Sequence, residues 1–203
     1  LPVGEEAGCL PEVSVDDIKE ILDGVKGKNV DILLFPLYSG YAGIQETIKI
    51  KEELFSKHAR ENNCYVVYNT LVRNNGRNAC ISKIIGRDGR FIGEYVKTHK
   101  IEGLDIDLAL GSDMPVFELD FGKVGLMAGT DIFIPELAEI YSIKGAEILL
   151  CSLGVWPLRD DTEQNYLLRG RAIADYFYVA ASAYASHTGM YMTNNYELLN
   201  REN

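Results

Sequence analysis

The 203-residue sequence predicts an α/β layered sandwich built as a single domain over residues 1–203. Two observations predict this class. Short apolar runs typical of buried strands alternate with longer segments whose apolar residues recur at helical spacing. In addition, three strand-like runs in the first half of the chain are joined by Asn-Gly and Asp-Gly pairs, which favour tight antiparallel turns. No internal repeat or linker interrupts this order, so we expect one domain.

The first element is a helix that begins after Ser14. Ser14 has the N-cap preference, Asp17 follows at the third position of a capping box, and Ile18, Ile21 and Leu22 recur at helical spacing. The next run, DILLFP, is apolar throughout and too short for a helix. It therefore indicates a strand that is buried on both faces.

A second helix and an antiparallel meander follow. The mixed polar and apolar stretch from Gln45 to Asn62 predicts the helix. The meander is expected from CYVVYNTLV, ACISKIIG and FIGEYV, which are separated by NNGR and RDGR.

The second half of the chain continues the alternation. PVFELD and KVGLMA predict a hairpin, and the second of these strands leads directly into Gly-Thr-Asp. Pro135 begins a helix that ends before Gly145. A strand at EILLCS, a helix from about residue 160 to 175 and a strand at FYVAASAY complete the pattern.

Composition excludes some classes of function. Thirty acidic and twenty basic residues give a net charge of −10, which opposes binding of nucleic acid by this chain. The longest apolar run, at 176–185, is shorter than the roughly 20 residues of a membrane helix.

The cysteines indicate a reducing environment. Four of them are too few for a disulfide scaffold, and they form no metal-binding pattern: Cys9, Cys64, Cys80 and Cys151. We therefore expect a cytoplasmic protein without a metal or cofactor. The chain begins at Leu1 rather than methionine and stops just after a strand-like run, which indicates an excised part of a longer protein.

Four motifs in order resemble the nitrilase, or carbon-nitrogen hydrolase, superfamily. They are LLFPLYSGY, GEYVKTHK, GLMAGTDIFIPELAEIYSIKGAEILL and RGRAIADYFYVAAS. The resemblance implies a four-layer αββα sandwich, with edge strands missing at both ends of this chain. It also implies a cleft that in the family holds a glutamate base, a lysine and a cysteine nucleophile.

Only one of the three family residues stands at its expected position. Lys97 matches the lysine, whereas Leu37 stands where the pattern has glutamate and Gly129 where it has cysteine. Glycine has no atom that can attack a carbonyl carbon, and loss of a base alone typically costs about 10²- to 10⁴-fold in rate. This pattern predicts a pseudoenzyme, a domain that binds a ligand without converting it.

A displaced nucleophile is the alternative. Thr130 is adjacent to the glycine, but a step of one residue along a strand turns a side chain to the other face. Cys151 lies in an apolar strand, where a buried thiol is ordinary packing.

Charged residues near the motifs have two interpretations each. Lys97 is either a half-exposed strand-end residue or a pocket cation that needs an anion. Asp131 either neutralises Lys97 or caps the helix that begins near Pro135, and His99 is interpreted as a structural histidine rather than as a base. The resemblance also implies a supporting acidic residue in the loop after Lys97, and spacing alone does not choose among Glu102, Asp105 and Asp107.

Aromatic side chains are candidates for the wall of the cleft. Facing inward, they would hold an ammonium by cation-π attraction, and otherwise they are core or surface cover. The expected ligand-binding residues are Leu37, Tyr38, Tyr41, Lys97, Gly129, Thr130, Asp131 and Trp156.

These observations together predict a non-catalytic sensing domain for a small amine, betaine, amide or carboxylate. The resemblance extends to the nitrilase-like module of AraC-type transcription regulators, whose DNA-binding domain would lie outside this chain. The alternatives are an amidase with a displaced nucleophile and a structural subunit. The resemblance also implies a homodimer through helices at 135–144 and 160–175.

Overall fold

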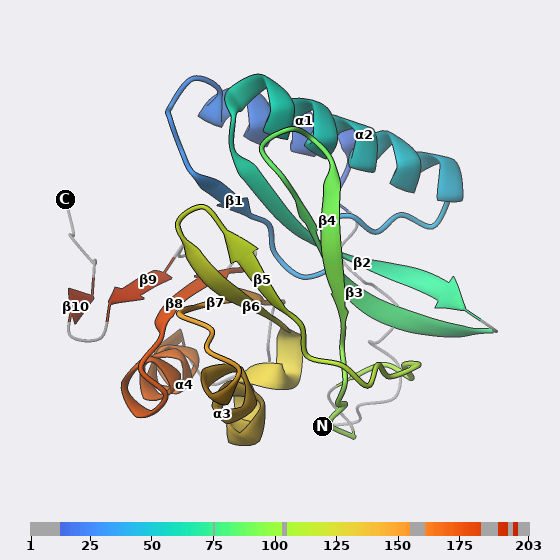
Figure 1. Cartoon of the computed structure of the whole chain (residues 1–203). Helices are drawn as coiled ribbons and strands as arrows, with labels where there is room; N and C mark the ends of the chain where they lie inside the picture. The colour runs from blue at the N-terminus through green and yellow to red at the C-terminus, as the bar shows by residue number, and fades with distance from the viewer. Residues whose placement is uncertain are drawn as a thin grey trace.

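The computed structural model describes residues 13–74, 76–102, 105–154, 161–183, 191–194 and 197–198. Two β-sheets lie face to face, with a pair of helices on the outer side of each (Figure 1). This arrangement confirms the predicted four-layer αββα sandwich.

The first sheet and its helices come from the first half of the chain. Its strand order is β1-β2-β3-β4, with β1 parallel to β2 and the others antiparallel. The predicted meander is therefore confirmed, with Gly76 and Gly89 at positive φ in its two turns. The elements are α1 (Val15–Val25), β1 (Ile32–Leu34), α2 (Gln45–Asn62), β2 (Tyr65–Asn74), β3 (Arg77–Ile85) and β4 (Phe91–Val96).

The second sheet has the order β10-β9-β8-β7-β6-β5, and its centre, β6-β7-β8, is parallel. Its elements are β5 (Val116–Leu119), β6 (Gly122–Ala128), the 3₁₀ helix η1 (Gly129–Phe133), α3 (Pro135–Ile143), β7 (Ile148–Ser152), α4 (Asp161–Ala174), β8 (Tyr178–Ser182), β9 (Tyr191–Asn194) and β10 (Glu197–Leu198).

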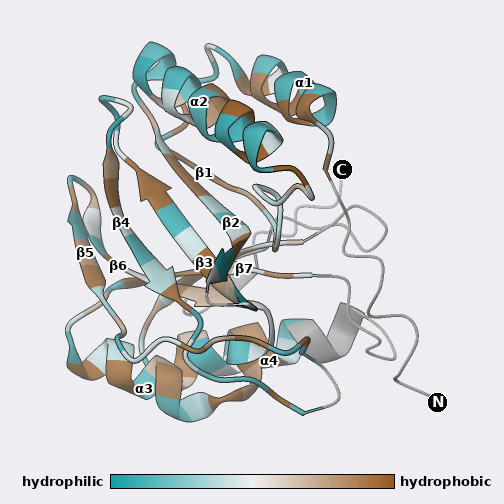
Figure 2. Cartoon of the chain, turned by 90° about the vertical axis from the view of Figure 1, so that its right-hand side faces the viewer, coloured by the Kyte–Doolittle hydropathy of each residue, from teal (hydrophilic) through white to brown (hydrophobic). Residues whose placement is uncertain are grey.

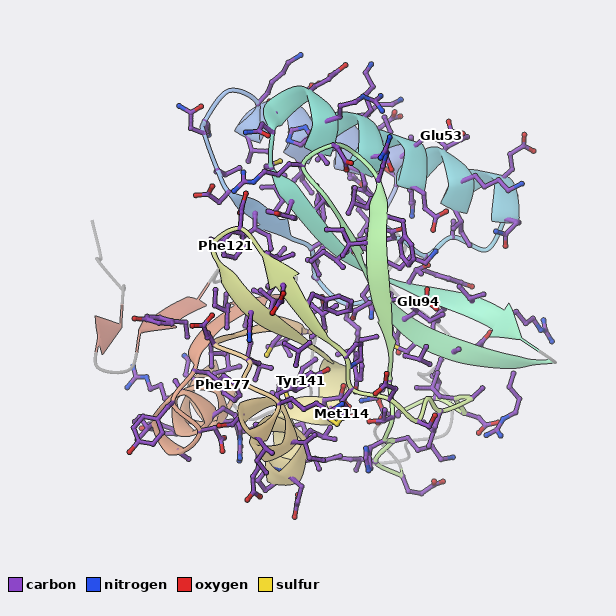
Figure 3. The ribbon with its side chains drawn as sticks, viewed as in Figure 1. Glu53, Glu94, Met114, Phe121, Tyr141 and Phe177 are labelled. Atoms are coloured by element: carbon purple, nitrogen blue, oxygen red, sulfur yellow. The ribbon has the colours of Figure 1, made fainter. Side chains whose placement is uncertain are left out.

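The main core lies around β6, between the first sheet and α3. Val124, Leu126 and Met127 are almost completely buried, and apolar residues line the strands between the two helix layers (Figure 2). On the helix side, Tyr141 points toward the second sheet (Figure 3) and donates a hydrogen bond to Leu126 O at 2.7 Å. Its ring lies so close to Gly125 that an added Cβ would meet it at 2.7 Å. Glycine is therefore required on this face of β6.

Some predicted elements differ from the structure at their limits. β1 covers only Ile32–Leu34, which is shorter than the predicted run. Leu33 is buried in the core beneath α1 and α2, and Ile32 and Leu34 are partly buried against the main core, so both faces of the strand are covered, one less completely than the other. The predicted strand at FYVAASAY ends at Ser182 as β8, and Tyr184 lies outside the described residues.

The outer helices of the second sheet expose several apolar side chains. They are Ile140 and Ile143 on α3 and Tyr166 and Ile173 on α4, and Tyr176, which follows α4, is exposed as well. The predicted homodimer through this face stays a prediction. Among the helices in the described part of the chain, none is both long and apolar enough to cross a bilayer.

Candidate functional site

The site begins where β6 ends and the chain turns into η1. Gly129 lies at this turn with φ +58°, a left-handed conformation that glycine adopts without steric cost. Thr130 and Asp131 then belong to a helical turn rather than to a strand. The expectation that Thr130 faces away from the site is therefore wrong, because strand alternation stops at Ala128.

Lys97 is the centre of the site. It follows β4, its side chain is 1% exposed, and its ammonium makes three hydrogen bonds. Nζ donates to Asp131 Oδ1 at 2.8 Å, to Thr130 Oγ1 at 2.7 Å and to Ala128 O at 2.9 Å. An ammonium has three protons, so all of them are engaged. The interpretation of Lys97 as a half-exposed strand-end residue is wrong.

Asp131 neutralises Lys97. Its Oδ2 accepts hydrogen bonds from Tyr95 Oη at 2.8 Å and from the backbone N–H of Ala128 at 2.9 Å. It does not cap α3, whose N-cap is Ile134 and has no side-chain capping bond. Burial, followed by the charge of Asp131, raises the pKa of Tyr95 well above its usual value, so this phenol remains a donor.

Thr130 connects the buried lysine to a second carboxylate. Its side chain is fully buried, and its Oγ1 donates to Asp105 Oδ2 at 2.5 Å. Asp105 is half-buried in the loop after β4 and also accepts from the backbone N–H of Ile101 at 2.7 Å.

The structure therefore selects Asp105 from the three acidic candidates of this loop. Asp107 instead pairs with Arg77 at 2.7 Å, and the Glu102 side chain is 92% exposed beside Lys100. His99 is exposed, with Nδ1 at 2.9 Å from Thr98 Oγ1.

The loop after β1 contains three further residues that were predicted to bind a ligand. Leu37 and Tyr38 are buried and Tyr41 is partly exposed. The backbone N–H of Leu37 donates to Leu153 O at 3.0 Å, and that of Tyr38 donates to Asn69 Oδ1 at 3.0 Å. The backbone of Tyr38 has φ +60°, a left-handed conformation that residues other than glycine seldom adopt. These hydrogen bonds help to hold it.

The predicted aromatic lining is only partly described. Trp156 lies outside the described residues. The binding of an ammonium ligand between the aromatic rings stays a prediction.

The described cysteines are unsuited to act as nucleophiles. Cys64, Cys80 and Cys151 are buried free thiols. Burial raises the pKa of Cys80 to about 12 and raises that of Cys151 still further. The reactive form is the thiolate, so packing remains the role of Cys151. No group of three or more ligand-type side chains within the described ranges could hold a metal ion.

Sequence reasoning missed Tyr95 as a member of the site. It contacts both Asp131 and Thr98. A signal was available, because Lys97 directly follows the strand that contains Tyr95, and residues two apart in extended backbone face the same side.

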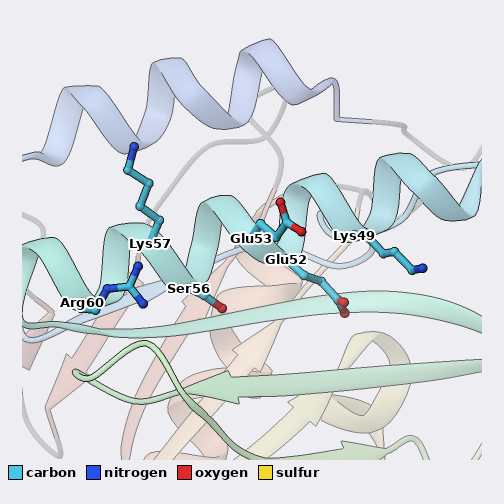
Figure 4. A pocket seen from close by; sticks show the side chains of 6 residues that line it. All are labelled: Lys49, Glu52, Glu53, Ser56, Lys57 and Arg60. Carbon is cyan, nitrogen blue, oxygen red and sulfur yellow. The ribbon is translucent and has the colours of Figure 1, made fainter.

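A surface depression runs along the exposed side of α2 (Figure 4). It is lined by Lys49, Glu52, Glu53, Ser56, Lys57 and Arg60. These mixed charges lie on the outer helix layer, whereas the Lys97 cluster lies where the two sheets meet η1. We place the candidate site at the Lys97 cluster because its polar groups are buried and converge.

The fold and this buried lysine-carboxylate cluster define an αββα protein of the nitrilase type. Residues 12–198 match the Carbon-nitrogen hydrolase family. The chain belongs to this family, which confirms the resemblance carried by its four motifs.

Relatives and solved structures agree with the family. The chain is 30% identical to a 2-oxoglutaramate amidase of Bacillus subtilis over 77% of this chain and 64% of that protein. It is 37% identical to a probable nitrilase of Schizosaccharomyces pombe over 41% of this chain and 30% of that protein. A mutant of the Nesterenkonia AN1 amidase superposes with a TM-score of 0.77 at 16% identity, covering 91% of this chain and 79% of that one. The chain thus matches from about a third to two thirds of the length of these curated relatives.

These matches correct the prediction of a pseudoenzyme. That prediction rested on Leu37 and Gly129 at two family positions, but the chain belongs to a hydrolase family and its relatives bear amidase names. The prediction assumed that a site without these two side chains has no activity. The structure nevertheless keeps Lys97, Thr130 and Asp131 in contact with one another. The same matches give no support to a sensor domain of an AraC-type regulator.

Proposed function

We propose that the protein hydrolyses the carbon–nitrogen bond of small carboxamides at the Lys97 cluster. One observation carries the proposal. A buried ammonium contacts a carboxylate and a hydroxyl at once, at the turn between β6 and α3. Burying charged groups is costly even when they are paired, so such a cluster is a candidate for a functional site.

The cluster has the groups that amide hydrolysis requires. The carbonyl oxygen gains negative charge in the transition state, and a fixed cation in a site of low dielectric stabilises that charge. Lys97 supplies the cation, and Asp131 and Tyr95 hold it in position. The leaving nitrogen needs a proton, which a positioned acid must provide.

The named relatives support the choice of substrate class. They include the 2-oxoglutaramate amidase of Bacillus subtilis and an omega-amidase of Danio rerio, the latter 29% identical over 64% of this chain. Both names specify amide substrates. Because this chain matches 64% and 51% of those two proteins, we treat its own activity as a proposal.

Ammonia release from 2-oxoglutaramate and butyramide tests the proposal. We expect turnover by the unaltered protein and a loss of about 10²-fold or more in Lys97→Met, because removal of the cation destabilises the transition state. Lys123→Met is the matched control, since Lys123 is half-exposed at the start of β6 and pairs with Glu118 on the surface.

Folding must be checked together with turnover. Circular dichroism melts of Lys97→Met, and of Lys97→Met combined with Asp131→Asn, separate lost chemistry from lost structure. Absence of ammonia from the unaltered protein with every amide would contradict the proposal. Thermal stabilisation by the same amides without turnover would instead favour the sensing role.

A further inference from the structure

We infer that Thr130 Oγ1 is the nucleophile of this reaction and that Asp105 is the base that accepts its proton. The inference rests on the proposed hydrolase function. It assigns the attacking atom to a hydroxyl one residue beyond Gly129, where the family pattern has cysteine.

Thr130 Oγ1 accepts one hydrogen bond and donates another, and the directions of these two bonds support the inference. A lysine ammonium is only a donor, so Thr130 Oγ1 accepts from Lys97 at 2.7 Å. Its single proton is then directed to Asp105 Oδ2 at 2.5 Å. A hydroxyl whose proton points at a carboxylate, with a cation on its oxygen, has the arrangement of an activated nucleophile.

The oxygens of the other carboxylate in the cluster already have hydrogen-bond partners. Both oxygens of Asp131 are occupied by Lys97, Tyr95 and the backbone of Ala128. Asp131 is therefore a positioning residue for Lys97. Asp105 is the carboxylate that touches the hydroxyl.

Four other buried hydroxyls and thiols have no carboxylate as a hydrogen-bond partner among the described residues. The hydroxyls of Ser39 and Thr70 are buried without a hydrogen-bond partner among the described residues. The thiols of Cys80 and Cys151 are completely buried, and the Cys80 thiol hydrogen-bonds to the side-chain amide of Asn69. None of these four side chains therefore has a carboxylate that could accept its proton.

Burial indicates from which side a substrate approaches. Thr130, Lys97 and Asp131 are buried, whereas Asp105 is half-exposed in the loop after β4. The base is thus the outer end of the cluster. It can meet both the hydroxyl and, later, a water molecule.

The first half of the reaction forms an ester. Thr130 Oγ1 attacks the amide carbonyl carbon while its proton passes to Asp105, and the carbonyl π electrons move to oxygen beside Lys97. When this oxyanion collapses, the C–N bond breaks and Asp105 returns the proton to the nitrogen, which leaves as ammonia. The acyl group is then bound to Thr130.

The second half releases the product. Asp105, again a carboxylate, takes a proton from water as the water oxygen attacks the ester carbon. Collapse breaks the ester C–O bond, and the proton returns to Thr130 Oγ1. The net change is amide plus water giving carboxylic acid plus ammonia, with no other reactant.

Substitution at Thr130 tests the assignment. We expect Thr130→Val, which keeps the shape without the hydroxyl, to lose about 10²-fold or more in kcat, because no attacking atom remains. Thr130→Ser should stay within about tenfold of the unaltered protein, since it retains the hydroxyl. Equal melting temperatures would confirm that Thr130→Val is folded.

Substitution at Asp105 tests the base. Asp105→Asn should lose about 10²-fold or more in kcat and should also lose the acidic limb of the pH–rate profile. Asp107→Asn is the matched control in the same loop, because Asp107 pairs with Arg77 on the surface. A purely structural role of Asp105 would leave the pH profile unchanged.

Trapping the intermediate locates the attacked atom. Turnover quenched with acid should leave an acyl adduct on Thr130 in peptide mass spectra. Full activity of Thr130→Val, or an adduct on another residue, would overturn the assignment while the hydrolase function stood. Absence of ammonia from the unaltered protein would overturn both.

Discussion

Two buried lysines, Lys97 after β4 and Lys51 in α2, have different surroundings. Lys97 is 1% exposed and contacts a carboxylate and a hydroxyl. Lys51, in α2, is 0% exposed, and its ammonium donates to the main-chain carbonyls of Ser39 at 3.5 Å and of Tyr41. A backbone carbonyl accepts a hydrogen bond but does not exchange a proton near neutral pH, whereas hydroxyl and carboxylate groups do.

This difference indicates that Lys51 positions a loop, whereas Lys97 lies in a site where a reaction can occur. Lys51 attaches the Ser39–Tyr41 segment to α2, and the main-chain carbonyl of Asn69 in β2 accepts a hydrogen bond from the N–H of Gly40 in the same segment. Lys97 lies among groups capable of proton transfer. Burial of a lysine by itself therefore does not identify a reacting site, and the chemical type of its partners must decide.

The largest expected effect on stability is that of Lys97→Met. This change leaves the carboxylate of Asp131 buried without its cation, which typically lowers the free energy of unfolding by about 3–5 kcal/mol. Urea denaturation followed by circular dichroism measures it. Adding Asp131→Asn should recover part of the loss, because the unpaired charge is then removed. A loss below about 1 kcal/mol in Lys97→Met would contradict a tightly coupled buried pair.

A smaller effect is expected for Lys51→Met. The carbonyls of Ser39 and Tyr41 lose a donor in a buried setting, which costs about 1–3 kcal/mol per unsatisfied group. In the amidase assay, KM should change more than kcat, because the Ser39–Tyr41 segment loses its attachment to α2 while the reacting groups keep their contacts. A loss of kcat in Lys51→Met as large as that in Lys97→Met would contradict the view that Lys51 only positions the loop. Lys57→Met is the control, since Lys57 is exposed on the same helix.

Much of the fold followed from local pattern. The second helix was predicted at Gln45–Asn62, where α2 lies, and the meander strands were predicted within about two residues of their limits. These elements are long or bounded by turn residues, so periodicity identifies them. β1 differs, because its length depends on where its neighbour β2 pairs with it.

The site was less predictable than the fold. Its lysine was identified through a motif, but the direction of Thr130 depends on the positive φ of Gly129, which ends the strand alternation. The choice of Asp105 depends on the path of a loop with no period. Thr130 and Asp105 are 25 residues apart in the sequence. Their contact is set by tertiary packing, which no local sequence pattern encodes.

The smallest expected effect concerns a third buried basic side chain, His58, which is on α2 with Lys51. His58 is 7% exposed, and its Nε2 has no hydrogen-bond partner among the described residues. Burial is the main cause that lowers its pKa below the usual 6.5, with Lys26 acting in the same direction and the carboxylates of Glu61 and Asp23 opposing it. The unfolded chain therefore binds a proton more readily than the folded one. The contribution of the neutral imidazole to stability is present above pH 6.5 and is lost as pH falls from 6.5 through the lower pKa of the folded state. Urea denaturation from pH 7.5 to 5.5 should show a loss that His58→Gln reduces. The exposed His99 serves as the control, and an equal reduction in His99→Gln would show that the slope does not come from burial on α2.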